Sequence, residues 1–328
     1  MKIAVFSVKP YDIIHLNRFN DRHQLEFLAP QLTEQTARLA AGADAVCCFV
    51  NDTLDGAVID VLAGAGVKLI AMRCAGYNNV DVEAARRAGI AVARVPEYSP
   101  YAVAEHSVAL IMGLNRQIRR AQARIRENDF SLDGLLGFDM HGKTVGVVGT
   151  GKIGVAFIRI MRGFGCEVIC HDPNVNPEVT AMGAVYGSLD ELWRNSHIIS
   201  LHCPLVAATH HLINSKVLDS MRDRVMIINT SRGGLIDTYA VIEGLKSGKV
   251  GYLGLDVYEE EAELFFENYS SEVLQDDIFA RLLTFNNVLI TGHQAFFTGE
   301  ALNAIGQVTM QNINAFFDGN PAGMCLVA

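Results

Sequence analysis

The sequence predicts an α/β fold with two domains, each built on a doubly wound parallel sheet. Three observations support this prediction. The chain has 328 residues, which is enough for about two hydrophobic cores. Short apolar runs typical of strands alternate with segments of helical periodicity along most of the chain. A strand-like run, a glycine-rich turn and a helical segment follow one another between Lys143 and Asp172.

Strand-like and helix-like segments alternate through the first 98 residues. Strands are expected at 3–8, 45–50, 68–72 and 90–94, and helices at 33–41, 55–65 and 82–88. This order predicts a parallel sheet wrapped by helices. Ala75 and Gly76 follow the third strand, where ligands of open α/β sheets bind. Their loop could present backbone N–H groups to an anion, or it could be a plain strand-to-helix turn.

A domain boundary is expected around residues 95–100, where two prolines flank a polar segment. Ser99 can cap a helix that has Pro100 in its first position and extends to about Asn128. A last helix, 298–318, is expected to return to the first domain. We therefore assign residues 1–98 with 297–328 to one domain, and residues 99–296 to the other.

The segment 143–172 has the form of a dinucleotide-binding fingerprint. A strand (144–148) precedes Gly149, Gly151 and Gly154, a helix follows, and a second strand ends before Asp172. The glycines allow a tight turn, close approach of a pyrophosphate and close helix packing. Asp172 would accept hydrogen bonds from ribose hydroxyls and repel a 2′-phosphate. The prediction is a Rossmann-like domain that binds NAD, against the alternative of a strand–helix turn with a solvent-exposed acid.

Three chemically active side-chain types follow later strands of this domain. Strands are expected at 197–201, 225–229, 252–255 and 287–291, which makes six in the sheet. Arg232, the acidic run 256–261 and His293 come directly after three of them. An arginine, a carboxylate and a histidine beside a dinucleotide suit hydride transfer coupled to proton transfer on a carbonyl acid. Taken singly, each could instead be a salt-bridge partner, a solvated charge or a strand-end hydrogen bonder.

Composition excludes several classes of function. The net charge of −9 argues against non-specific nucleic-acid binding, and no apolar stretch reaches the length of a membrane helix. The seven cysteines include no C-x-x-C pair, which favours reduced thiols and a cytoplasmic location. His210 and His211 have no further ligands at metal spacing, so no metal site is expected.

Seven motifs occur in order along the chain: RCAGYNNVD, VPEYSPYAVAEH, VGTGKIG, SLHCPL, NTSRGGLID, LDVYEEE and TGHQAF. With them the chain resembles the D-specific 2-hydroxyacid dehydrogenase family over essentially its full length. The segment after Glu261 resembles the bacterial fermentative D-lactate dehydrogenase branch. The resemblance implies two Rossmann-like domains with an interdomain active-site cleft, NAD as cofactor, and reversible reduction of pyruvate to D-lactate. It also implies a homo-oligomer, either a dimer or a tetramer.

The resemblance also implies roles for individual residues. The family's catalytic arginine, glutamate and histidine correspond to Arg232, Glu261 and His293, with the spacing selecting Glu261 over Glu259 and Glu260. Substrate contacts correspond to Ala75, Gly76, Tyr98, Arg232, His293 and Phe296. Further cofactor contacts correspond to Lys152, Ile153, Asp172, Cys203, Pro204, Thr209, Thr230, Ser231, Arg232 and Asp256. The alternatives are a sister enzyme acting on glyoxylate, hydroxypyruvate or phenylpyruvate, and an NAD(H)-sensing protein similar to transcriptional corepressors.

Overall fold

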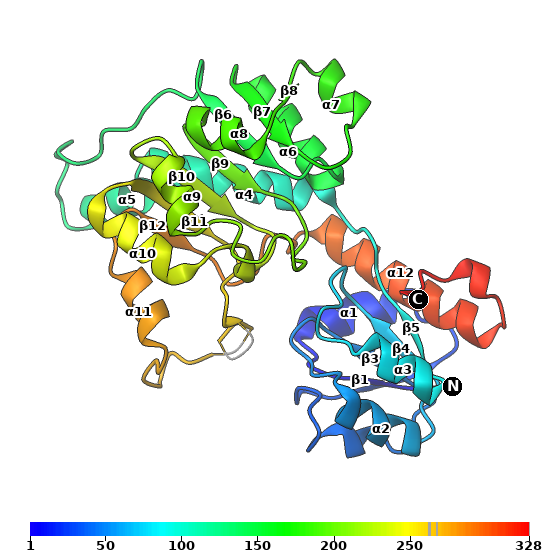
Figure 1. The fold of residues 1–328 in the computed structure, drawn as a ribbon. Helices are drawn as coiled ribbons and strands as arrows, with labels where there is room; N and C mark the ends of the chain where they lie inside the picture. The colour runs from blue at the N-terminus through cyan, green and yellow to red at the C-terminus, as the bar shows by residue number, and fades with distance from the viewer. Residues whose placement is uncertain (262–263, 267, 328) are drawn as a thin grey trace. The chain divides into compact units, whose positions relative to one another are not determined.

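The structure, a computed structural model, describes residues 1–261, 264–266 and 268–327. The chain divides into two compact units, Met1–Ser99 with Phe297–Ala328 and Pro100–Phe296. Ser99 lies in the first unit, whereas the sequence-based boundary placed it in the second. Each unit contains one parallel sheet with flanking helices (Figure 1), so the predicted α/β fold with two parallel-sheet domains is confirmed.

The first unit is built on five parallel strands in the order β2-β1-β3-β4-β5. These strands are β1 (Lys2–Val5), β2 (Gln24–Phe27), β3 (Ala45–Cys48), β4 (Leu69–Met72) and β5 (Ala91–Ala93). Its helices are α1 (Pro10–Phe19), η1 (Ala37–Ala40), α2 (Gly56–Gly64), α3 (Val82–Ala88), α12 (Gly299–Phe317) and η4 (Pro321–Gly323). Strands β3 and β4 are buried along their whole length, as the apolar runs predict for a parallel sheet covered on both faces.

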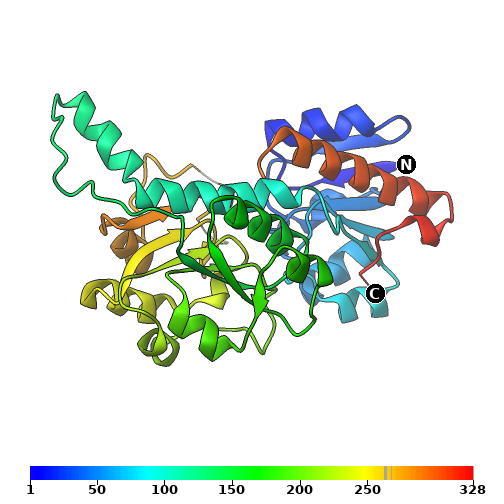
Figure 2. The ribbon, with the colours of Figure 1, turned by 90° about the horizontal axis from the view of Figure 1, so that it is seen from above.

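The C-terminal helix α12 packs on α1 although nearly 300 residues separate them in sequence (Figures 1 and 2). The two helices cross closely at Gly306, where a Cβ atom would lie 2.6 Å from the carbonyl oxygen of His15. Asn312 ties α12 to the end of the sheet. Its side chain donates to the carbonyl oxygen of Arg94 at 2.9 Å and accepts from the N–H group of Cys325 at 2.8 Å.

Two details of the first unit differ from the sequence expectation. Helix α1 and strand β2 were not predicted, although Pro10 at the first helical turn and Asp12, which accepts from the Lys9 N–H group, are helix-start signals. The helix expected at 33–41 is only the 3₁₀ turn η1. Thr36 explains this because its hydroxyl group bonds to the local backbone instead, donating to the carbonyl oxygen of Gln31 at 2.5 Å.

The second unit is built on seven parallel strands in the order β12-β11-β10-β9-β6-β7-β8. The strands are β6 (Thr144–Val148), β7 (Glu167–His171), β8 (Val185–Tyr186), β9 (Ile198–Leu201), β10 (Val225–Asn229), β11 (Val250–Leu255) and β12 (Val288–Ile290). The helices are α4 (Pro100–Asn115), α5 (Ile118–Arg126), α6 (Lys152–Gly163), α7 (Pro177–Ala181), α8 (Leu189–Asn195), α9 (Ser215–Ser220), η2 (Gly233–Leu235), α10 (Thr238–Ser247) and α11 (Asp277–Leu283). The predicted six strands omitted β8, a two-residue edge strand too short to show periodicity.

The order of strands in the second unit creates one crevice. Strands β7 and β8 are added on one side of β6. The chain then crosses to the other side of β6, where β9, β10, β11 and β12 follow one another. Connections leaving β6 and β9 therefore diverge at their carboxyl ends, which is where ligands of doubly wound sheets bind. The glycine-rich turn follows β6, so the sheet places it at this switch point.

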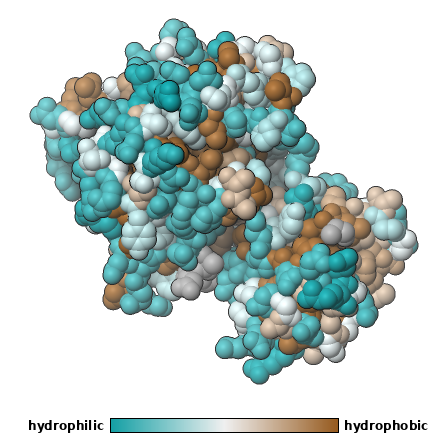
Figure 3. Space-filling view, in the orientation of Figure 1, coloured by the Kyte–Doolittle hydropathy of each residue, from teal (hydrophilic) through white to brown (hydrophobic). Residues whose placement is uncertain are grey.

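The helix expected from Pro100 to about Asn128 is broken. Gln117 has a left-handed backbone conformation (φ 50°) and separates α4 from α5. Figures 1 and 2 show α5 and the segment after it projecting from the rest of the second unit, and we call residues 118–136 the arm. Several large apolar side chains of the arm are exposed, whereas the face of the chain visible in Figure 3 is mainly hydrophilic. They are Ile118, Ile125, Phe130, Leu132 and Leu136.

No helix in the described ranges combines the length and apolarity that crossing a membrane would require.

Candidate active site

The turn between β6 and α6 has room only for glycine at two positions. Gly149 has φ 98°, and a Cβ atom there would lie 2.6 Å from the carbonyl carbon and oxygen of His202. A Cβ atom on Gly154 would lie 2.1 Å from the carbonyl oxygen of Gly149. The sharp turn and the close approach of α6 to β6 therefore both depend on the absence of side chains.

The N-terminus of α6 is open. Gly151 is its exposed N-cap residue, and no side chain of the described residues caps the helix there. A Cβ atom on Gly151 would have no neighbour within 4 Å. Lys152 and Ile153 form the start of the first turn, whose backbone N–H groups lack partners within the helix and attract anions. A pyrophosphate could approach this backbone without steric hindrance.

Asp172 is held in place beside the turn. Its two carboxylate oxygens accept hydrogen bonds from the backbone N–H groups of Thr150 and Asn174, each at 2.8 Å. A carboxylate has about four acceptor sites, so acceptor capacity is left for ribose hydroxyls. The open helix end and the oriented carboxylate together fit NAD.

Other predicted cofactor positions lie at the ends of β9, which is beside β6, and β10, the next strand in the sheet. The carbonyl oxygen of the buried Cys203 accepts from the Ser231 hydroxyl at 2.7 Å, and this bond joins the two strand-end loops. The Thr209 hydroxyl donates to the carbonyl oxygen of Pro204 at 2.7 Å and shapes the exposed turn between them. Thr230 is buried, and its hydroxyl group bonds that of Ser107 at 2.8 Å. Their contacts with the cofactor stay predictions.

Arg232 is presented by a hydrogen-bonded turn after β10. The buried Asn229 side chain accepts from the Ser231 N–H group at 3.0 Å and donates to the Arg232 carbonyl oxygen at 2.8 Å. One guanidinium nitrogen, Nη1, donates to the Ser231 carbonyl oxygen at 2.6 Å. Because a guanidinium carries five N–H donors, its remaining donors can still bind a carboxylate. The side chain is half-buried.

His293 and Glu261 form a direct pair. Glu261 Oε1 lies 2.8 Å from His293 Nδ1, and Oε2 accepts from the Tyr258 N–H group at 2.9 Å. The side chains of His293 and Glu261 are 16% and 18% exposed, so a substrate can reach the pair although most of its surface is buried. Nδ1 is the donor to the carboxylate, which leaves Nε2 available for a substrate. Of the three consecutive glutamates, Glu261 is thus the one that contacts His293.

A buried network behind His293 fixes its backbone, and sequence reasoning did not find it. The Asp256 carboxylate, at the end of β11, accepts from the Thr291 hydroxyl at 2.5 Å and from the N–H groups of Gln294 and Ala295 at 2.9 and 2.8 Å. His106, on α4, bonds the Thr291 hydroxyl at 2.9 Å. Asp256 therefore holds the turn that carries His293 (φ 50°), and its contact with a nicotinamide stays a prediction.

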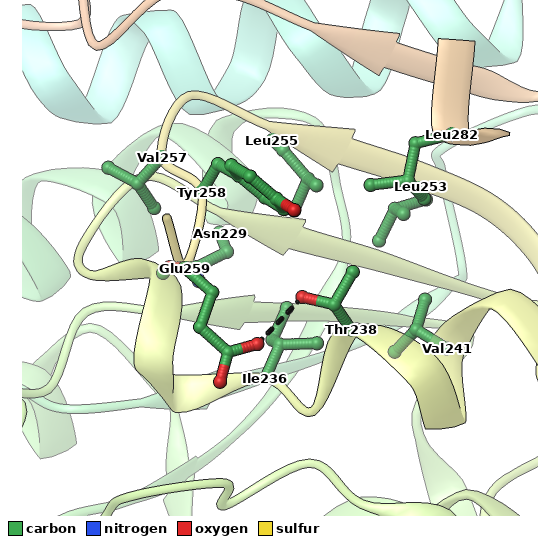
Figure 4. Close-up of a pocket in the computed structure, with 11 residues that line it drawn as sticks. Asn229, Ile236, Thr238, Val241, Leu253, Leu255, Val257, Tyr258, Glu259 and Leu282 are labelled. Atoms are coloured by element: carbon green, nitrogen blue, oxygen red, sulfur yellow. Dashed lines mark hydrogen bonds between the residues drawn. The ribbon is translucent and has the colours of Figure 1, made fainter. Parts of the chain in front are cut away.

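A second network holds the Arg232 loop against the Glu261 segment. A Cβ atom on Gly233 would lie 2.1 Å from the Tyr258 carbonyl group, so the two segments touch. Glu259 accepts from the Thr238 hydroxyl at 2.9 Å (Figure 4) and lies 2.5 Å from His211 Nε2. Figure 4 shows the Glu259 carboxylate turned toward Thr238, at the edge of a hollow of about 10 Å³ that has room for at most one water molecule.

The expectation that His210 and His211 lack a third ligand is not met, since Glu259 lies within 4.8 Å of both. However, the two imidazole rings are stacked, with centroids 4.0 Å apart and planes 24° apart. Nearly parallel rings cannot both direct a nitrogen lone pair at one metal ion, because each lone pair lies in its own ring plane. Glu259 and His211 therefore serve here as a clamp between loops.

The predicted substrate residues divide between the two units. Ala75 and Gly76 form the loop after β4 in the first unit, where Arg94 donates to the Ala75 carbonyl oxygen at 2.8 Å. In the described part of the chain, neither residue's own N–H group donates a hydrogen bond, so both are available to an anion. Tyr98 is half-buried and belongs to the segment that follows β5 in the sequence and precedes α4. Phe296 ends the second unit and is 8% exposed.

Three side chains of the proposed chemistry thus come from neighbouring strands. Arg232, Glu261 and His293 follow β10, β11 and β12, which are adjacent in the sheet. Their strands end at the same edge as β6 and its glycine-rich turn. This arrangement can hold a carboxylate, carry a proton on an imidazole and bind a dinucleotide within one unit.

Comparison with known proteins agrees with this geometry. Residues 108–295 match the family model "D-isomer specific 2-hydroxyacid dehydrogenase, NAD binding domain". The chain is 54% identical to the 2-hydroxyacid dehydrogenase homolog of Haemophilus influenzae over 315 residues, 95% of each protein. It is 52% identical to the D-lactate dehydrogenase of Escherichia coli over 316 residues, 96% of each. The prediction of an NAD-binding domain is confirmed.

The fold is similar to that of a solved relative with both ligands bound. The Aquifex aeolicus D-lactate dehydrogenase complexed with NAD and lactic acid superposes with a TM-score of 0.90 at 32% identity, covering 99% of this chain and 98% of the other.

Proposed function

We propose a function from one premise: the chain belongs to the D-isomer specific 2-hydroxyacid dehydrogenase family. The proposed activity is the NAD-dependent, reversible reduction of pyruvate to D-lactate. The observation that supports it most is the Glu261–His293 pair, at 2.8 Å, which joins the loops after β11 and β12, the two strands that follow in the sheet after β10, the strand that presents Arg232. Two relatives, at 52% and 48% identity, are named D-lactate dehydrogenases, which favours lactate over other 2-hydroxyacids.

The bound cofactor supplies a hydride for the carbonyl carbon of the substrate, and the residues of this chain supply the rest. Arg232 binds the substrate carboxylate through two parallel N–H donors, a grip that a lysine cannot make. The N–H groups of Ala75 and Gly76 are proposed as further carboxylate donors. Tyr98 and Phe296 are proposed to border the methyl group of the substrate.

His293 is proposed as the proton donor. Its imidazolium would donate from Nε2 to the substrate oxygen as the carbonyl group gains electrons, leaving a neutral ring whose Nδ1–H group still bonds Glu261. The carboxylate of Glu261 fixes the orientation of the ring through Nδ1. In lactate oxidation the neutral ring takes the hydroxyl proton back.

The test is a substrate panel with purified protein and saturating NADH. Pyruvate should be reduced with the highest kcat/KM among pyruvate, glyoxylate, hydroxypyruvate and phenylpyruvate, and chiral analysis should give D-lactate. A preference for another keto acid would assign the chain to a sister enzyme of the same family. His293→Gln, which preserves a hydrogen bond to Glu261, should lower kcat by about 10²–10⁴-fold with NADH affinity retained.

Self-association and location are further parts of the proposal. The arm exposes Phe130 and Leu132 at 71% and 81%, which favours a partner subunit over solvent. Phe130→Ser with Leu132→Ser should lower the mass measured by light scattering, while the control Val273→Ser, at an apolar residue as exposed as Leu132, should not. None of the seven cysteines forms a disulfide in the described part of the chain, as in proteins of reducing compartments, and this supports a cytoplasmic location. The proposed reduction of pyruvate by NADH would suit a fermentative role.

A further inference from the structure

A second concave site lies at the amino ends of the strands of the seven-stranded sheet, opposite the ends that carry the glycine-rich turn. It is a pocket of about 310 Å³, at the lower end of the range of small-molecule sites. Its lining includes Lys143 and His197, which directly precede β6 and β9, and Arg224, which directly precedes β10. These strands are four or five residues long, so roughly 13–17 Å separate the pocket from the turns at their carboxyl ends. The pocket is therefore distinct from the dinucleotide site.

The pocket concentrates positive charge on a chain with a net charge of −9. Lys143, Arg222 and Arg224 all line it. Throughout the described ranges, neither arginine has a carboxylate partner. The one carboxylate in the lining, Asp223, is paired with Lys249 at 2.9 Å. Two guanidinium groups are thus left with unused donors around one cavity.

His197 adds a neutral donor to the same wall. Its Nδ1 accepts the backbone N–H group of Thr144 at 3.1 Å, so the proton of the neutral ring is on Nε2. Burial, followed by the nearby Arg222 and Lys143, lowers the pKa of His197, and these effects outweigh the opposing charge of Glu167. The ring is therefore a neutral hydrogen-bond donor at neutral pH, in a positive electrostatic environment.

Two aromatic side chains also line the pocket. The rings of Phe138 and Tyr252 have centroids 6.2 Å apart and planes tilted by 57°. The Lys143 ammonium group lies 5.9 Å from the Phe138 ring centroid. The pocket thus offers an apolar surface for a carbon skeleton next to donors for an anionic group.

We propose that this pocket binds a small phosphorylated organic anion. A phosphomonoester carries close to two negative charges at neutral pH and three acceptor oxygens. These match two arginine forks, a lysine and a neutral histidine donor, whereas a monocarboxylate such as pyruvate would leave most donors unused. The two aromatic rings receive the organic part of the ligand. Since the pocket is at the far ends of the strands that carry the glycine turn and Arg232, it takes no part in catalysis.

The probe for the test is phenyl phosphate, measured by isothermal titration calorimetry on the native assembly at pH 7.5. Saturating NADH keeps the cofactor phosphate site filled. We expect one binding site per chain, and binding that weakens as salt is raised. Arg222→Gln combined with Arg224→Gly should weaken binding by at least about tenfold. Arg224 has φ 61°, which glycine adopts readily, so this substitution should preserve the fold.

The control is Arg194→Gln, which removes an exposed arginine of the same unit that pairs with Asp190. It should leave phenyl phosphate binding unchanged. The double variant should keep the NADH affinity and kcat of the parent, which separates this proposal from the proposed function. No heat of binding to the NADH-saturated parent, or equal affinity in the double variant, would refute the site. Equal affinity for sulfate and phenyl phosphate would reduce it to a non-specific anion surface and overturn the proposed ligand class.

Discussion

Three glycine-to-alanine substitutions in and beside α6 separate the packing of the turn from its role in cofactor binding. Gly154→Ala places a Cβ atom 2.1 Å from the Gly149 carbonyl oxygen, 0.9 Å inside the 3.0 Å limit below which such contacts essentially never occur. The neighbour is backbone, so α6 must move away from the turn. Overpacking of this kind costs about 1–3 kcal/mol.

For a unit of this size, that cost should lower the thermal midpoint by about 2–12 °C. Gly163→Ala, in the same helix, is the matched control because its Cβ atom would have no neighbour within 4 Å. It should be neutral or stabilise by up to about 1 kcal/mol through helix propensity. Circular dichroism melting curves of both variants measure the difference.

Gly151→Ala tests the other half of the argument. Its Cβ atom meets nothing in the protein, so the variant should lose less than about 1 kcal/mol, the cost of a poorer N-cap. The added methyl group would stand where the pyrophosphate approaches the backbone, so NADH affinity should fall at least about tenfold by fluorescence titration. A Gly154→Ala variant that melts with Gly163→Ala, or a Gly151→Ala variant with parental NADH affinity, would refute the reasoning.

Three further substitutions test individual side chains. Arg232→Lys keeps the charge but loses the two-point grip, and steady-state kinetics should show kcat/KM for pyruvate about 10–100-fold lower. Glu261→Gln keeps one of the two acceptor oxygens that His293 and the Tyr258 N–H group use and removes the anion, so kcat should fall more than KM rises; unchanged kcat would contradict the proposed role. Burial lowers the pKa of His202 to about 3, below the ordinary value of about 6.5, so the unfolded chain binds a proton there that the folded chain excludes. Stability should therefore fall as pH drops from 6.5 toward 3, by up to about 1.4 kcal/mol per unit, and urea unfolding at pH 7 and 5 should show a smaller loss for His202→Asn.

Periodic and chemically distinctive segments were predictable because their signals are local. Most strands of both sheets are apolar runs, and the turn at Gly149 is marked by three glycines whose spacing reflects contacts within one strand–turn–helix unit. Short or exposed elements were not. Strand β8 has two residues, and η1 replaces an expected helix because Thr36 bonds to a backbone carbonyl group. The break at Gln117 has no proline or glycine to mark it.

The site shows the same division. Chain position after a strand was enough to single out Arg232 and His293, since parallel strands end at one edge of a sheet. The residues that hold these side chains in position could not be predicted from the sequence. Asp256 and His106 are 150 residues apart, and His211 and Glu259 are 48 apart, yet each pair meets because sheet order brings their strands and helices together.

By itself, the sequence determined the class of each domain, the cofactor turn and the residue types of the chemistry, because periodicity, glycine spacing and strand-end position are properties of short segments. The tertiary structure alone decided which polar groups are buried behind His293, and that hydrogen-bond donors from the starts of three strands share one pocket. These facts depend on distances between segments far apart in the chain, and strand order in the sheet, which local sequence does not encode, sets those distances.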